Sequence, residues 1–297
     1  MALFAALFSM LYVLLLLFFP LSLTGFLYKL PIEPIDVVIP CCEKDLLTLD
    51  LCIDGIQKNG SFIRNIFVIS SKPLTNQATW IDESLFPFTK EEVALALCKG
   101  NKELAHHFLQ FPSCRLGWYY QQLLKFYAPF VIEGISSNVL ILDADTIFLN
   151  PTKFLNEHYE ALYASSNSFY TPYSQHMAKF LPGLSRIHPK QSGICHHMLF
   201  QRPILEDLFS KVESYHQIPL WKAFCLFVDP KYLSKSGASE YEIYFHFAFS
   251  QTEQLHVRPL KWKNIQHLSQ LTALQSQGYH YASCHDYLRK LPKPLVK

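Results

Sequence analysis

The stretch that most constrains the fold of this chain is VLILDADTIFL, residues 139–149. Four branched apolar residues run directly into Asp143 and Asp145, and apolar residues resume behind them until Asn150 and Pro151 end the stretch. A continuous apolar run without alternation predicts a strand that is buried on both faces. The sequence therefore predicts an α/β fold in which two carboxylates lie at the carboxyl end of a buried strand.

Asp143 and Asp145 would lie where open α/β sheets bind ligands, because the crevice outside the strand ends is exposed and concave. Two unpaired carboxylates repel each other and are costly to bury, so the pair requires a cation. Hard divalent ions such as Mn²⁺ or Mg²⁺ bind carboxylate oxygens and share their remaining positions with a diphosphate. A solvated turn or helix cap is the alternative for Asp-x-Asp, and the apolar flanks favour the metal site.

An apolar strand that ends in Asp-x-Asp resembles the metal-diphosphate motif of GT-A-type glycosyltransferases. Four blocks of the chain also resemble a bacterial group of such proteins of poorly defined specificity; they are residues 36–56, 115–149, 192–200 and 239–245. The resemblance implies a GT-A-like mixed sheet flanked by helices. It also implies a metal-dependent, hexosyltransferase-like enzyme that moves a sugar from a nucleotide-sugar donor to an envelope glycan or lipid acceptor.

The composition argues against several other classes of protein. The chain has 26 basic and 24 acidic residues, a formal net charge of +2 and no long basic run, so nucleic acid is not expected as a partner. Its eight cysteines show neither a C-x-x-C pair nor regular spacing. This argues against a zinc ribbon or a disulfide scaffold and favours buried thiols in a reducing compartment.

The N-terminal segment, residues 1–30, is predicted to be a single-pass transmembrane anchor. No residue from Ala2 to Tyr28 is charged, and about 20 apolar residues suffice to span a bilayer. A cleaved signal peptide is the alternative, but no Lys or Arg precedes the apolar run and no small-x-small cleavage site stands before Lys29. Because the nearest positive charge, Lys29, follows the span, the positive-inside rule favours a cytoplasmic catalytic domain.

The remaining residues, 31–297, suit one α/β domain with a large core, since half of the chain is apolar. We divide this GT-A-like domain into a nucleotide-binding half, 31–150, and an acceptor half, 151–297. Helical spacing of apolar residues predicts helices at 91–97 and 102–109.

A strand at 35–40, a helix at 45–56 and a strand at 64–71 form a predicted βαβ unit. No G-x-G-x-x-G follows the first strand, which argues against a dinucleotide site. The resemblance implies instead that Asp45 contacts the base or ribose of the donor. An N-cap for the following helix is the alternative role for Asp45.

Apolar and aromatic residues recur on one face at helical spacing and predict a helix over 116–127. Gln121, Gln122 and Lys125 lie off this stripe, and a polar outer face is the structural explanation. The resemblance implies that all three are donor-side residues. Lys125 and Arg115, at the helix entrance, would supply the cations that a diphosphate leaving group requires.

Ser192 and Gly193 precede two histidines and an apolar strand. This segment is similar to the acceptor-facing segment of GT-A enzymes, where a small residue lets the sugar approach, so the resemblance makes both residues part of the binding site. Adjacent side chains on a strand point to opposite faces, so one of His196 and His197 is expected to face the site.

Ser239 and Glu242 match a capping box, as N-cap and third helical residue, which leaves Glu240 at the first helical position. The helix dipole favours a carboxylate there, which is the structural interpretation. A general base that deprotonates the acceptor hydroxyl is the functional interpretation, and both stay open. Near the C-terminus, the resemblance makes His285 a third metal ligand beside the two aspartates.

Two other classes of function remain open. A haloacid-dehalogenase-type phosphatase also has an apolar strand that ends in Asp-x-Asp, with Asp143 and Asp145 as nucleophile and acid. Its pattern places Thr or Val two residues after the second Asp, where this chain has Ile147, and this chain lacks a later acidic pair in a strand context. A non-catalytic anchored binding protein that keeps the fold is the other alternative.

Overall fold

The structure, a computed structural model, describes residues 27–111 and 115–289. The predicted transmembrane anchor at 1–30 lies almost wholly outside the described residues. In the two described ranges, no helix is both long and apolar enough to cross a membrane.

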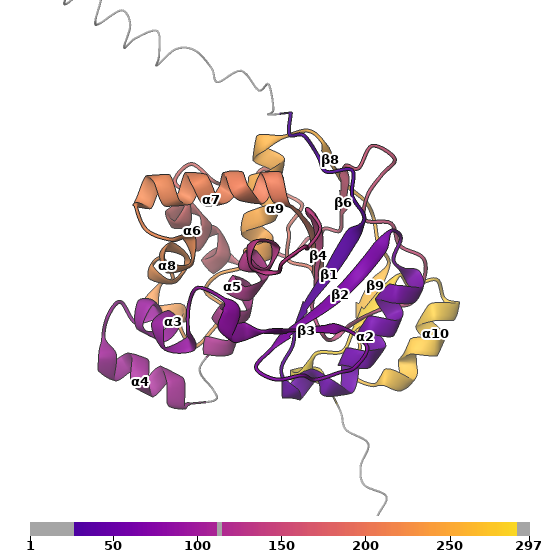
Figure 1. Cartoon of the computed structure of the whole chain (residues 1–297), viewed down its shortest axis with the longest axis horizontal. Helices are drawn as coiled ribbons and strands as arrows, with labels where there is room; N and C mark the ends of the chain where they lie inside the picture. The colour runs from indigo at the N-terminus through magenta and orange to yellow at the C-terminus, as the bar shows by residue number, and fades with distance from the viewer. Residues whose placement is uncertain (1–26, 112–114, 290–297) are drawn as a thin grey trace, which may run out of the picture.

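A mixed five-stranded sheet lies at the centre of the molecule (Figure 1). Its order is β3 (Thr79–Asp82), β2 (Ile63–Ser70), β1 (Ile35–Pro40), β4 (Asn138–Leu142) and β7 (His197–Gln201). The first four strands are parallel, and β7 runs antiparallel to β4. The predicted α/β fold with a mixed sheet is confirmed, and every residue of β4 is buried, as its apolar run predicts.

Helices cover both faces of this sheet (Figure 1). Helix α2 (Leu46–Asn59) lies on one face, and α5 (Leu116–Val131) and α9 (Glu240–Gln251) lie on the other. The chain moves outward along the sheet from β1 to β2 through α2 and returns from β3 to β4 through α5, so crossovers of one hand put these helices on opposite faces. The helices predicted at 45–56 and 116–127 are confirmed.

The described residues also form further helices and short strands outside the central sheet. They are η1 (Glu43–Asp45), η2 (Glu83–Leu85), α3 (Lys90–Leu97), α4 (Lys102–Gln110), β6 (Ala161–Tyr163), α6 (Thr171–Phe180), α7 (Arg202–His216), α8 (Leu220–Leu226), η3 (Pro230–Tyr232), β8 (Leu255–Val257), η4 (Leu268–Gln270), α10 (Leu271–Ser276) and η5 (Asp286–Leu288), where η marks a 3₁₀ helix. Helices α3 and α4 confirm the predictions at 91–97 and 102–109.

The apolar residues of 139–149 form two strands, β4 and a short one behind the aspartates, because the chain turns at Asp143 and Asp145. The second sheet consists of β5 (Thr146–Phe148), β10 (Tyr281–Ser283) and β9 (Trp262–Asn264). The Thr146 N–H closes the turn by donating to the Asp143 carbonyl at 3.0 Å. The carboxylates therefore lie at a turn between two sheets rather than along one strand.

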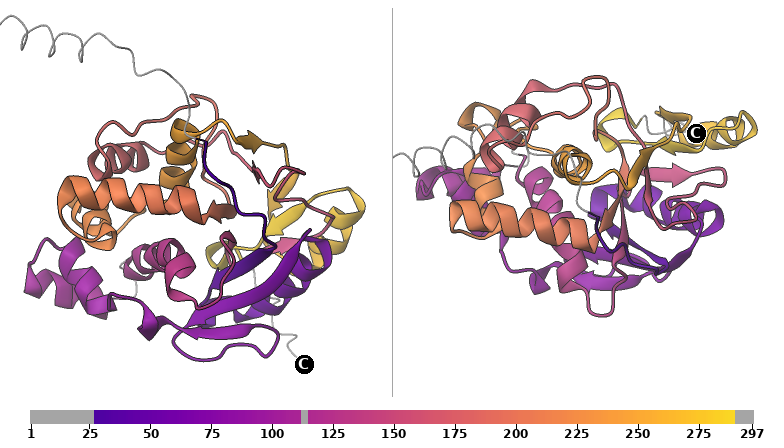
Figure 2. Two further views of the ribbon diagram at one scale, coloured as in Figure 1. Left: turned by 45° about the horizontal axis from the view of Figure 1, so that its top comes forward. Right: turned by 90° about the horizontal axis from the view of Figure 1, so that it is seen from above.

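Helix α2 holds this second sheet in place. A Cβ at Gly55 would lie 2.8 Å from the Phe148 carbonyl oxygen, so only glycine lets the helix approach β5 this closely. One turn later, the Asn59 amide donates to the same carbonyl at 3.0 Å. Both views of Figure 2 show the C-terminal segment beside α2, although the two are far apart in the sequence.

Residues from both predicted halves share one main hydrophobic core. Phe126 of α5 stacks on Phe200 of β7 with ring centroids 5.8 Å apart, and Phe224 of α8 packs edge-on against Phe126 at 6.2 Å. The boundary at residue 150 between the two halves stays a prediction. Cys52 and Cys225 are buried free thiols, as the cysteine spacing predicts.

Candidate active site

The candidate site is built on the turn that follows β4. Asp143 and Asp145 project from this turn with side chains that are 25% and 15% exposed. Because β4 lies between β1 and β7 in the sheet, the turn lies beside the carboxyl end of β1. The expected place of both carboxylates, at the carboxyl end of a buried strand, matches the structure.

Lys125 of α5 is a buried cation that joins two carboxylates from distant parts of the chain. Its Nζ lies 2.6 Å from Asp143 Oδ1 and 2.6 Å from Glu240 Oε1. The side chains of Lys125 and Glu240 are only 4% and 2% exposed. The Tyr241 ring lies 4.2 Å from Lys125 Nζ, and the Tyr241 hydroxyl donates to Asp143 Oδ1 at 3.1 Å. The ammonium thus has the compensating charge and π density that a buried cation needs.

Burial and the paired charges act in opposite directions on this cluster. Burial lowers the pKa of Lys125, but Asp143 and Glu240 raise it more, so its pKa lies above the ordinary value and the ammonium stays charged. Burial raises the pKa of Glu240; Lys125 opposes this shift and Asp143 adds to it. Since the net shift is upward, Glu240 is a stronger base than an exposed glutamate.

Gln122 holds the start of α9. Its Oε1 accepts a hydrogen bond from the Glu240 backbone N–H at 3.0 Å, and its Nε2 donates to the Trp118 carbonyl at 3.1 Å. The Glu240 N–H has no partner within its own helix, so Gln122 satisfies an otherwise unpaired donor. The structural explanation of a polar outer face is wrong for Gln122 and Lys125, because α9 packs over them and buries both.

Asp145 and His285 form the second polar pair of the site. His285 Nδ1 lies 2.8 Å from Asp145 Oδ2, and the Cys284 N–H donates to the Asp145 carbonyl at 2.8 Å. Burial raises the pKa of Asp145, but the hydrogen bond and charge of His285 lower it more, to below its ordinary value. Burial lowers the pKa of His285, but the hydrogen bond to Asp145 and the charge of that carboxylate raise it more.

His196 is the one of the two adjacent histidines that faces the site. Its ring centroid lies 5.0 Å from that of His285. The His197 ring instead packs in the core, 5.1 Å from Phe148 and 5.1 Å from Tyr281. Burial and then the charge of His285 lower the pKa of His196 to about 4, so its imidazole is neutral at pH 7.

Asp145 and His285 are hydrogen-bonded, and the same two side chains could supply neighbouring ligands to one divalent ion. Neighbouring ligands of an octahedral ion are about 3 Å apart when each lies about 2.1 Å from it, and the two side chains are 2.8 Å apart. Asp143 Oδ1 is held by Lys125 and Tyr241, so Oδ2 is the oxygen that would complete the set. Within the described ranges, no group of three or more His, Cys, Asp or Glu side chains is already arranged as a metal site.

A cavity of about 390 Å³ opens at the carboxyl ends of β1 and β2. Its walls include three of the predicted donor-side residues, Asp45, Arg115 and Gln121, together with Trp118. Asp45 makes no N-cap hydrogen bond to α2, and its Oδ1 instead accepts from Arg289 Nη2 at 2.7 Å. The volume lies in the range of small-molecule binding sites.

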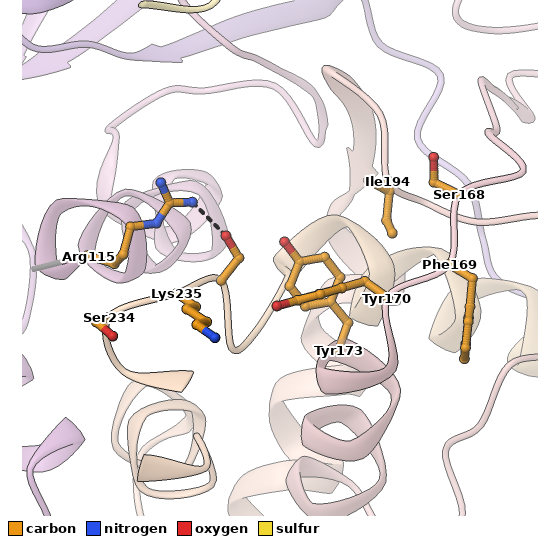
Figure 3. Close-up of a pocket in the computed structure, with 9 residues that line it drawn as sticks. Arg115, Ser168, Phe169, Tyr170, Tyr173, Ile194, Ser234 and Lys235 are labelled. Carbon is orange, nitrogen blue, oxygen red and sulfur yellow. Dashed lines mark hydrogen bonds between the residues drawn. The ribbon is translucent and has the colours of Figure 1, made fainter. Parts of the chain in front are cut away.

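A second cavity, of about 520 Å³, shares Arg115 with the first (Figure 3). Its other lining residues are Ser168, Phe169, Tyr170, Tyr173, Ile194, Ser234, Lys235 and Ser236. Arg115 Nη2 donates to Ser236 Oγ at 2.5 Å, and the guanidinium carbon lies 4.8 Å from the Trp118 ring centroid. Arg115 therefore lies where the two cavities meet.

Ser192 and Gly193 are buried under α9 and line neither cavity. The Glu242 carboxylate accepts from Ser192 Oγ at 2.8 Å and from the Gly193 N–H at 2.7 Å. A Cβ at Gly193 would lie 2.4 Å from the Tyr241 carbonyl oxygen, so the helix backbone explains the glycine. The predicted capping box is half wrong: Ser239 caps the Glu242 N–H at 3.3 Å, but the Glu242 side chain bonds to this loop instead.

Sequence reasoning missed two residues of the site, Tyr241 and Arg289. Tyr241 follows Glu240 in the first turn of a predicted helix, and this position could have indicated that Tyr241 lies near the site. Arg289 donates to the Lys44 carbonyl at 2.6 Å as well as to Asp45, and nothing local in the sequence indicates this contact.

No protein-family model matches the sequence, and no curated protein matches it. Among solved structures, the apo form of mouse xyloside xylosyltransferase 1 is similar with a TM-score of 0.38 and 10% sequence identity. The match covers 88% of this chain and 99% of the mouse chain. A likeness of this size shows neither a family nor a function.

Proposed function

We propose that this protein is a GT-A-like glycosyltransferase that moves a sugar from a nucleotide-sugar donor to a glycan or lipid acceptor. One observation carries the proposal: two carboxylates, Lys125 and His285 converge at the carboxyl end of β4. None of the four lines the cavity of about 390 Å³, but Arg289, whose N–H donates to the His285 carbonyl at 3.1 Å, also pairs with Asp45 in the cavity wall. This combination supplies ligands for a cation, a cation for a phosphate and room for a nucleoside. The phosphatase alternative gains no support from the cavity, whereas a non-catalytic binding protein would also use it, so only a measurement of turnover separates that alternative from a transferase.

The proposed donor site uses the residues that line this cavity. Asp45 and Gln121 would contact the nucleoside with hydrogen-bonding groups, and Trp118 offers it an aromatic surface. Arg115 and Lys125 would stabilise the negative charge that develops on the diphosphate leaving group. Three of the predicted binding residues would position Glu240 rather than contact the donor. Gln122, Ser192 and Gly193 hold the N-terminus of α9, which carries Glu240.

Asp145, His285 and Oδ2 of Asp143 would hold Mn²⁺ or Mg²⁺, which when bound neutralises the charge of a diphosphate. The lowered pKa of Asp145 keeps this carboxylate ionised and ready to bind a cation. His285 must give up its proton to serve as a ligand, so metal binding should release a proton.

Glu240 is the proposed general base for the acceptor hydroxyl. Its raised pKa supports this role, because a stronger base accepts the proton more readily. Its Oε1 is paired with Lys125 and its side chain is only 2% exposed. Glu240 can therefore act as a base only when its ion pair with Lys125 breaks. A diphosphate bound near Lys125 would compete with Glu240 for the ammonium and so favour this change.

We further propose that residues 1–30 anchor the enzyme in a membrane with its catalytic domain in the cytoplasm. The uncharged run to Tyr28 and the following Lys29 support this proposal. An acceptor that belongs to the cell envelope would fit such a location.

A thermal-shift screen of the full-length protein tests the donor site. The ligands are UDP-, GDP-, CMP- and dTDP-sugars, each with and without Mn²⁺. A ligand at 100 times its dissociation constant adds about 2.7 kcal/mol of stability, so a true donor gives a clear, metal-dependent shift. Asp145→Asn should abolish the shift, and Asp54→Asn, on the exposed side of α2, should retain it.

The absence of a shift with every sugar nucleotide and metal would contradict the proposal. Hydrolysis of p-nitrophenyl phosphate that depends on Asp143, without any nucleotide binding, would instead support the phosphatase alternative.

A further inference from the structure

The cavity of about 520 Å³ is separate from the proposed donor cavity and has a different character (Figure 3). Four segments that are distant in the sequence form it: the entrance of α5, the loop and first turn of α6, the segment before β7 that carries Ile194, and the loop that precedes α9. Lys235 and Arg115 are its charged lining residues, and no carboxylate is among the described residues that line it. The cavity wall therefore carries a net positive charge.

Three aromatic side chains make up the opposite wall. Phe169 and Tyr170 are 56% and 37% exposed, which is high for large rings in a polar loop. Tyr173 packs edge-on against Tyr170 with ring centroids 5.0 Å apart. In Figure 3, the hydroxyls of both tyrosines point toward the side of the cavity that Arg115 occupies. Exposed ring faces beside several hydroxyls suit a ligand with both C–H surfaces and hydroxyl groups.

The cavity also lies close to the proposed base. Ser236 precedes Glu240 by one short loop, and Ile194 directly follows the segment that Glu242 holds against α9. A ligand in this cavity would thus reach toward Glu240, while Arg115 separates it from the donor cavity.

We propose that this cavity binds the acceptor and that the acceptor unit is an anionic sugar, one that carries a carboxylate or a phosphate group. The inference rests on the proposed function for its catalytic meaning. The aromatic wall contacts the C–H face of the sugar ring, and Lys235 pairs with its anionic group. The serine hydroxyls of the loops are placed to bond its hydroxyl groups.

Sugar binding to the full-length protein, measured by saturation-transfer NMR without any nucleotide, tests this inference. The probes are D-glucuronate, D-glucose 6-phosphate and neutral D-glucose. At least one charged sugar should bind about fivefold or more tightly than glucose, because one partly exposed ion pair contributes about that factor. Lys235→Gln should remove this advantage without changing the affinity for glucose, and Tyr170→Ala should weaken binding of all three.

Lys231→Gln is the matched control, because Lys231 lies in the same inter-helix segment but pairs with Asp229 outside the cavity. It should leave all three affinities unchanged. A preference for glucuronate supports a carboxylate-bearing acceptor, and a preference for glucose 6-phosphate supports a phosphate-bearing one. Equal binding of glucose and both charged sugars, or a Lys235→Gln variant with unchanged affinities, would overturn the inference.

The two proposals fail separately. A metal-dependent donor shift without any binding of charged sugars would overturn only the acceptor assignment. Binding of charged sugars that depends on Lys235, without any donor shift, would support the anionic-sugar cavity and overturn the transferase.

Discussion

At the scale of single residues, Lys125 is the side chain on which the candidate site depends most. It is buried between Asp143 and Glu240, which come from a strand end and a helix start that are far apart in the sequence. Without this ammonium, two carboxylates would remain together in a poorly solvated place. Lys125 therefore has a structural task as well as its proposed task at the diphosphate.

Replacing Lys125 with methionine should lower the free energy of unfolding by about 3–5 kcal/mol, because it leaves buried carboxylates without a counter-ion. Urea unfolding of the purified protein measures this change. Lys72→Met provides the comparison, since Lys72 pairs with Glu43 at an exposed position and should change stability by less than about 1 kcal/mol. A similarly small change in the free energy of unfolding in both variants would show that Asp143 and Glu240 do not need the charge of Lys125 for stability.

Replacing Glu240 with glutamine tests its role as a base. The amide keeps the shape of the side chain but cannot accept a proton, so transfer to the acceptor should slow by about 10²–10⁴-fold. The donor-induced thermal shift should change little, because the donor cavity does not include Glu240. A transfer rate close to that of the unmodified protein would restrict Glu240 to holding Lys125.

At the scale of elements, the position of α9 decides the geometry of the site. This helix carries Glu240 and Tyr241, and its first turns are held by Gln122 and by the loop at Ser192. The close approach of Gly193 to the Tyr241 backbone is the tightest of these contacts.

Gly193→Ala should destabilise the protein by about 1–3 kcal/mol, because the added Cβ must push α9 away. It should also weaken donor-dependent activity by displacing Glu240. Gly117→Ala is the control for stability: a Cβ at Gly117 meets no atom within 4 Å, and alanine favours the helix. If the Gly193→Ala variant were as stable as Gly117→Ala, α9 could move away from residue 193 without a loss in the free energy of unfolding.

The elements that the sequence predicts well are those with local patterns. The buried run of β4 and the apolar stripe of α5 need no information from elsewhere in the chain. The break between β4 and β5 was not predictable, because β5 pairs with β10 from the C-terminal part of the chain. The same reason explains the site: the residue types indicate chemistry, but only the fold shows that Lys125 pairs with Asp143 and Glu240. It also shows that His285 pairs with Asp145.

At the scale of the whole molecule, the two cavities share one lining residue, and the cluster around Lys125 lies at the turn after β4. Arg115 joins the cavities, and Lys125 joins the β4 turn to the helix beside the second cavity. A donor and an acceptor bound in this way would meet near Glu240.

The stability of the whole molecule should also depend on pH through buried histidines. Burial lowers the pKa of His176 to about 4 in the folded state, against about 6.5 when unfolded. The unfolded chain then binds more protons at low pH, so this stability is complete above pH 6.5 and is lost as the pH falls toward 4. His176 alone should cost about 3 kcal/mol across that range, and His196 acts in the same direction.

Urea unfolding at pH 7.5 and pH 4.5 measures this dependence. His176→Gln can still donate to the Phe224 carbonyl that His176 Nε2 contacts at 2.8 Å, but it does not titrate. The variant should therefore lose less stability on acidification than the unmodified protein. An identical loss in both would exclude His176 as a source of the acid sensitivity.

The proposed catalytic site is tested by the release of the nucleotide leaving group, a nucleoside diphosphate or CMP, from the donor that gives the largest thermal shift. The measurement compares the full-length protein with Asp145→Asn and Asp54→Asn, with and without Mn²⁺. We expect release that depends on the metal. It should fall at least about 100-fold in Asp145→Asn, which corresponds to about 2.7 kcal/mol of lost transition-state stabilisation. It should be unchanged in Asp54→Asn. Release at the same rate in both variants would contradict a catalytic site at the end of β4.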